Sequence, residues 1–110
     1  MGKHDYSYGW EKLYNAVCCL AGRGDQKSRL AAALIHNVTM LTMQPNGTYL
    51  PPELQHKMNE LMRKMTSVEA VGNEGTIQAT VNSLTDEEVS DAVREIIDCY
   101  DGVCRYRPVD

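Results

Sequence analysis

Apolar residues recur every three or four positions through most of this 110-residue chain. That spacing places side chains on one face of an α-helix, whereas a strand alternates its two faces at every second position. The repeat stops and restarts at clusters of Gly, Pro and Asp, which predicts several helices rather than one long helix. We therefore predict an all-α fold, a compact bundle of four to five amphipathic helices.

The first two predicted helices have recognisable ends. Residues 9–21 form the first, and Gly22 ends it because glycine favours the position after a helix. Asp25 is a good N-cap for a second helix over residues 26–43, whose broad apolar face predicts a central position. The apolar faces comprise Trp10, Leu13, Tyr14, Val17, Leu20 and Ala21, and then Leu30, Ala31, Leu34, Ile35, Val38 and Leu41.

Three further helices are predicted in the second half. Pro51 and Pro52 open one of them, because proline is tolerated in a first helical turn. Residues 76–84 fit helical spacing, although their β-branched side chains leave a strand as the alternative. Thr85 and Glu88 have the spacing of a capping box, which starts the last helix over residues 86–104. The apolar faces comprise Leu54, Met58, Leu61 and Met65, with Met62 at the edge, and then Val89, Ala92, Val93, Ile96, Ile97, Tyr100 and Val103.

The length is typical of one domain, so we expect a single helical domain over residues 1–110. Residues 1–8 are expected to be a flexible N-terminal segment and residues 105–110 a short tail. No apolar run reaches the roughly 20 residues that cross a bilayer, and the polar N-terminus lacks the apolar stretch of a secretory signal. We therefore expect a cytoplasmic protein that does not contact a membrane and whose four cysteines are free thiols.

Metal binding and catalysis have little support. Cys99 and Cys104 are five positions apart and no tight Cys/His cluster accompanies them, so neither a metal nor another cofactor is expected. Helical geometry predicts Cys104 toward the core, Cys99 at its edge, and Cys19 facing outward on the first helix. No nucleophile–base motif is present, and we expect a protein that is not an enzyme.

The charge is unevenly distributed along the chain. Residues 1–68 hold eight Lys/Arg against five Asp/Glu, a balance of +3, whereas residues 69–110 hold three against ten, a balance of −7. An acidic half disfavours direct nucleic-acid binding and suits a protein partner with a basic surface.

The last predicted helix carries the first candidate site, an acidic stripe opposite its apolar face. Such a stripe can imitate a row of phosphates, and the alternative is an ordinary solvated helix face. The candidate binding residues are Glu87, Asp91, Glu95, Asp98 and Asp101.

The second candidate site is apolar. Apart from Met1, all methionines lie between Met40 and Met65, where they suit either an adaptable binding surface or an irregular core. Met62 is the candidate for contact because it lies at the edge of its stripe. Trp10 joins it, since Trp10, Met62 and Tyr100 are too large to fit easily inside so small a bundle, and exposed apolar patches mark interfaces.

These observations predict a small non-enzymatic interaction or regulatory module that binds a protein partner, with a homodimer also expected. The alternative is an acidic inhibitor, of the type found in phages and mobile elements, that occupies the basic cleft of a nucleic-acid-handling enzyme. A metal-binding or enzymatic protein is the third and least supported interpretation.

Overall fold

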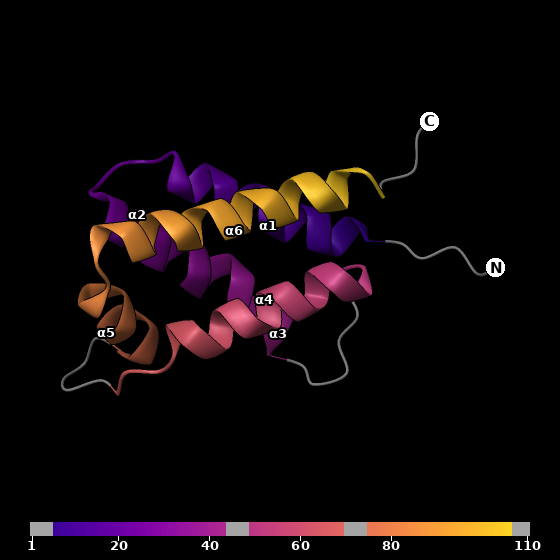
Figure 1. The fold of residues 1–110 in the computed structure, drawn as a ribbon. Helices are drawn as coiled ribbons and strands as arrows, with labels where there is room; N and C mark the ends of the chain where they lie inside the picture. The colour runs from indigo at the N-terminus through magenta and orange to yellow at the C-terminus, as the bar shows by residue number, and fades with distance from the viewer. Residues whose placement is uncertain (1–5, 44–48, 70–74, 107–110) are drawn as a thin grey trace.

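The computed structural model describes residues 6–43, 49–69 and 75–106, and every regular element among them is a helix (Figure 1). The elements are α1 (Ser7–Leu20), α2 (Gln26–Ala33), η1 (Leu34–Val38), α3 (Thr39–Thr42), α4 (Pro52–Met65), α5 (Gly75–Ser83) and α6 (Asp86–Cys104). The predicted all-α bundle is confirmed, and the segment for which a strand was the alternative forms α5.

Local end signals behave as the sequence predicts. The Asp25 carboxylate accepts a hydrogen bond from the Ser28 N–H at 2.7 Å, which caps α2. Thr85 and Glu88 form both hydrogen bonds of a capping box at the start of α6. Pro52 lies in the first turn of α4.

One continuous helix is formed by α2, η1 and α3, with a π-helical turn in its middle. There the Thr39 N–H reaches the Leu34 carbonyl, five residues back. The wider turn shifts the faces of the helix, so that Asn37 and Val38 are both buried while Ile35 is 38% exposed. The prediction that Ile35 widens the core face is therefore wrong, because it assumed a regular α-helix with 3.6 residues per turn through this segment.

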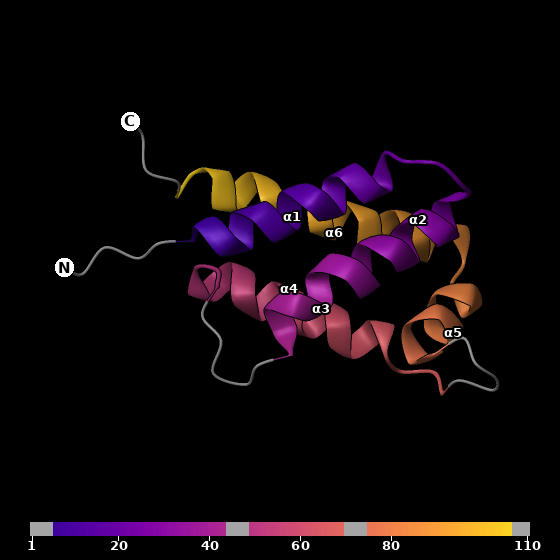
Figure 2. The same ribbon diagram turned by 180° about the vertical axis from the view of Figure 1, so that it is seen from behind.

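The core lies where this central helix meets α1, α4 and α6. Figure 2 shows the central helix between α1 and α4. Helix α6 contacts both α1 and α4, and it runs antiparallel to each of them (Figure 1). Leu34, Leu61 and Ile96 are buried as predicted. Val93 is only half-buried, because it lies on the α1 flank of α6 rather than at its centre.

The buried face of α1 differs from the predicted one. Gly9, Leu13 and Ala16 are buried, whereas Tyr14 is 45% exposed. Small residues let α1 approach its neighbours closely, so the helix is rotated and its large aromatic side chains lie beside the contact. A hydrophobic pattern that counts only large residues misses this arrangement.

The two ends of the described chain lie near each other. Tyr6 is buried and contacts Tyr106 edge-on, with ring centroids 5.9 Å apart. Helix α1 begins at Ser7, two residues earlier than predicted, so the segment expected to be flexible is ordered from Tyr6; residues 1–5 lie outside the described part. Among the described helices, none is both long enough and apolar enough to span a bilayer.

Candidate protein-binding site

The acidic side chains of α6 are divided between two surfaces. Asp91 and Glu95 face α4, together with Glu88 from the capping box. Glu87, Asp98 and Asp101 are exposed and do not line that surface. The predicted stripe is therefore only partly gathered in one place.

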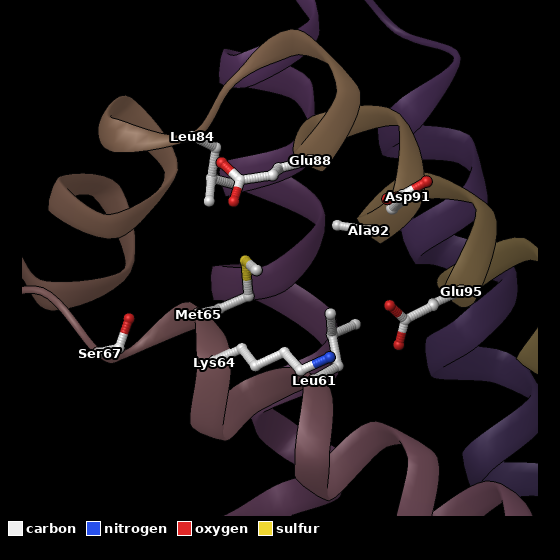
Figure 3. Close-up of a pocket in the computed structure, with 9 residues that line it drawn as sticks. All are labelled: Leu61, Lys64, Met65, Ser67, Leu84, Glu88, Asp91, Ala92 and Glu95. Carbon is white, nitrogen blue, oxygen red and sulfur yellow. The ribbon is translucent and has the colours of Figure 1, made fainter.

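A groove of about 370 Å³ lies between α4 and α6 (Figure 3). Its floor is apolar and its rim is polar. The floor consists of Leu61, Met65, Leu84 and Ala92, and the rim of Lys64, Ser67, Glu88, Asp91 and Glu95.

Helical spacing brings these residues together. Leu61, Lys64 and Met65 are three or four positions apart and share one side of α4. Glu88, Asp91 and Glu95 follow the same spacing on α6, so their carboxylates stand along the facing helix. We call the surface formed by these floor and rim residues the α4–α6 groove.

The end of the groove is fixed by the connections on either side of α5. The Val68 N–H donates to the Thr80 hydroxyl at 3.0 Å, which ties the segment after α4 to α5 and holds Ser67 at the rim. Glu88 is held in place because one of its carboxylate oxygens accepts the Thr85 N–H at 2.8 Å. Hydrogen bonds thus fix the end of the groove where Ser67 and Glu88 lie.

The rim has an excess of negative charge, with three carboxylates and one ammonium group. Lys64 makes no ion pair with any residue in the described part of the chain. Lys64 and Glu95 instead extend from their helices into the space between α4 and α6 (Figure 3). The rim therefore presents a negative potential above an apolar surface.

The apolar candidates of the sequence lie elsewhere. Met62 is buried at 8% exposure, so it offers little surface of its own for contact. It lies at the bottom of a hollow of about 380 Å³ where α3, α4 and α5 meet, beside Met43 and Ile77. Among the described methionines, Met40 and Met43 are the exposed ones. Trp10 is half-buried and stacks on Tyr14, with ring centroids 5.3 Å apart.

The cysteines also differ from their predicted positions. Cys99 is fully buried and Cys104 is only half-buried, the reverse of the prediction. Burial raises the pKa of the Cys99 thiol to about 12, so it is not a nucleophile near neutral pH. Cys18 is the exposed thiol, whereas Cys19 is half-buried and accepts a hydrogen bond from the Asn37 amide at 3.6 Å.

Helix rotation accounts for these reversals. The buried centre of α6 passes through Ile96, Cys99 and Val103, which places Cys104 toward the α1 flank. Within the described ranges, no three His, Cys, Asp or Glu side chains are grouped closely enough to hold a metal ion.

The sequence did not reveal the groove itself. The sequence pattern identifies Glu88 only as part of a capping box and Leu84 only as part of a short helix, and it gives no role to Lys64. These residues line one groove only because α4 packs against α6, and no local pattern in the sequence predicts that pairing. No protein-family model, curated protein or solved structure matches the chain.

Proposed function

We propose that this protein is a small interaction module that binds a basic segment of a partner protein in the α4–α6 groove. The observation that supports the proposal is the combination of an apolar floor with a rim of three carboxylates. No catalytic step is part of this proposal.

Lysine and arginine side chains complement such a surface. Their aliphatic stems pack on apolar groups while the charged head remains among polar or acidic groups. In the groove, Leu61, Met65 and Ala92 offer the apolar contact, and Asp91 and Glu95 offer the acceptors. Arginine fits best, because its planar head can bind a carboxylate through two parallel hydrogen bonds.

The size of the groove also suits side chains of a macromolecular partner. About 370 Å³ is near the lower end of the volumes of small-ligand pockets, roughly 300–1,000 Å³. Glu88 and Asp91 are exposed, so a partner surface can reach the rim without a conformational change. Charge complementarity of this kind increases association rates and makes binding sensitive to salt.

A second candidate function is inhibition of a nucleic-acid-handling enzyme by occupation of its basic cleft. The observation that favours it is the exposure of Glu87, Asp98 and Asp101 beyond the groove. Together with Asp91 these side chains extend the negative surface along much of α6. In that case the outer carboxylates contribute as much to the affinity for the enzyme as the groove does.

The test compares two double variants with the same change in charge. Asp91→Asn with Glu95→Gln neutralises the groove, and Glu87→Gln with Asp98→Asn neutralises the outer surface. Each is titrated against a fluorescent peptide with arginines on one helical face, and against the same peptide with citrulline in place of arginine. We expect the groove variant to lose about tenfold in affinity for the arginine peptide, since close charge pairs there are lost, and the outer variant to change little.

The outcomes separate the two candidates. A larger loss in the outer variant favours the inhibitor. Equal binding of the arginine and citrulline peptides by the unmodified protein, or unchanged affinity in both variants, contradicts the proposal. Circular dichroism checks the fold of both variants, and we expect both to be folded because none of the four residues caps a helix.

A further inference from the structure

The flank of α6 that faces α1 carries a different surface, rich in aromatic residues. Tyr14 and Ile97 are 45% and 43% exposed, and three half-buried neighbours surround them. We call this surface the α1–α6 strip; it consists of Trp10, Tyr14, Val93, Ile97 and Tyr100.

The aromatic rings of the strip are held in place by one another. Trp10 and Tyr14 stack with planes only 9° apart, and the Tyr14 ring lies 6.2 Å from that of Tyr100. The neighbouring Cys18 thiol raises the pKa of the Tyr14 phenol. Rigid aromatic side chains lose little entropy on binding, which is one reason why they dominate interface energies.

A hollow of about 350 Å³ continues the strip toward the start of α2. It shares Val93 and Ile97 with the strip and is completed by Gln26, Ser90 and Arg94. An exposed apolar side chain beside a hollow that can receive one is the arrangement of a self-complementary contact, in which each copy inserts a residue into the other.

The charges beside Ile97 indicate what covers the strip. Arg94 lies three residues before Ile97 and Asp101 four residues after it, and both are exposed. When two α6 helices pack antiparallel about a two-fold axis near Ile97, each Arg94 meets Asp101 of the second copy. Arg94 makes no ion pair with the described residues, and Asp101 is held only by an exposed pair with Arg105 at 3.1 Å, which costs little to exchange.

We infer that the α1–α6 strip is the interface of a homodimer, with the two α6 helices antiparallel and crossing near Ile97. This interface lies on the opposite flank of α6 from the α4–α6 groove. Dimerisation therefore leaves both grooves accessible, and it does not depend on the proposed function.

The first test is the oligomeric state at micromolar concentration by analytical ultracentrifugation. We expect the unmodified chain to sediment as a dimer and Ile97→Asp to sediment as one 12.3 kDa species. Ile35→Asp is the matched control, because Ile35 is similarly exposed but lies on η1, and it should remain a dimer. A monomeric unmodified chain, or a dimer that survives Ile97→Asp, overturns the inference.

A charge exchange tests the antiparallel pairing. Arg94→Asp and Asp101→Arg should each weaken the dimer by about tenfold, because symmetry creates two like-charge contacts per dimer. The double variant Arg94→Asp/Asp101→Arg should recover most of the affinity, since both ion pairs are re-formed with reversed polarity. A double variant as weak as the single variants overturns this pairing even if Ile97→Asp proves unfolded. The groove variant Asp91→Asn/Glu95→Gln should remain dimeric, which separates this interface from the groove.

Discussion

Gly9 of α1 packs directly against the main-chain carbonyl of Tyr49, and a Cβ at this position would overlap the carbonyl oxygen. Gly9→Ala should therefore destabilise the protein by about 1–3 kcal/mol, as overpacking does when the neighbour is backbone. The free energy of unfolding, measured by urea titration, checks this expectation.

Gly102→Ala is the matched control. A Cβ at Gly102 would come closest to the Leu54 side chain, at 3.1 Å, and a side chain can adjust where a backbone cannot. Alanine also favours the helix by up to about 1 kcal/mol relative to glycine. The Gly102 change should be clearly milder, and equal losses at the two positions would contradict the close packing described for α1.

The core predicts graded losses on truncation. Leu34 and Ile96 are fully buried, so replacement of either by alanine should cost about 2–5 kcal/mol. Val93→Ala should cost clearly less, because Val93 is half-buried on the α1 flank. Thermal or urea unfolding measures the difference, and a Val93 loss as large as that of Leu34 would place Val93 in the core after all.

The cap of α2 predicts a pH effect. The hydrogen bond from Ser28 lowers the pKa of the Asp25 carboxyl below its ordinary value of 3.8. The folded state thus favours the ionised carboxylate. The resulting stabilisation is present above pH 3.8 and is lost as pH falls from 3.8 through the lower folded-state pKa.

Two variants isolate this contribution. Asp25→Asn keeps a capping oxygen but cannot ionise, so it should flatten the dependence of the melting temperature on pH in this window while leaving a stable helix. Asp25→Ala should lower the melting temperature near neutral pH. An unchanged acid dependence in Asp25→Asn would show that other carboxyls account for it.

The four thiols should react in an order set by their positions. Cys18 is exposed and should react first with a thiol reagent, whereas Cys99 is buried with its pKa raised to about 12 and should react only on unfolding. Cys18→Ser should remove the fast phase of the reaction, and Cys99→Ser should leave it unchanged. A fast phase that persists in Cys18→Ser would place the accessible thiol elsewhere.

Features that depend on a few neighbouring residues could be predicted from the sequence. The Asp25 cap, the Thr85–Glu88 capping box and the bounds of α6 all rest on local chemistry. The apolar repeats likewise predicted that Leu34, Leu61 and Ile96 are buried.

Features that depend on how helices pack were predicted less well. A small rotation of α6 about its axis decides whether Cys99 or Cys104 is buried, and the sequence pattern does not fix that rotation. The burial of Gly9 and Ala16 reflects close approach of backbones, which a hydrophobicity pattern does not register. The groove needs side chains from two helices that are distant in the sequence, so only one of its walls, the acidic side of α6, was predicted.

The central claim is that the α4–α6 groove binds basic side chains, and a chemical-shift titration of the isotope-labelled protein with the arginine peptide tests it most directly. The account predicts that the perturbed amides cluster at Leu61, Met65, Leu84, Ala92 and Glu95, and that the citrulline peptide leaves them unmoved. Perturbations confined to the α1–α6 strip around Tyr14 and Ile97, with none along the groove, would contradict it.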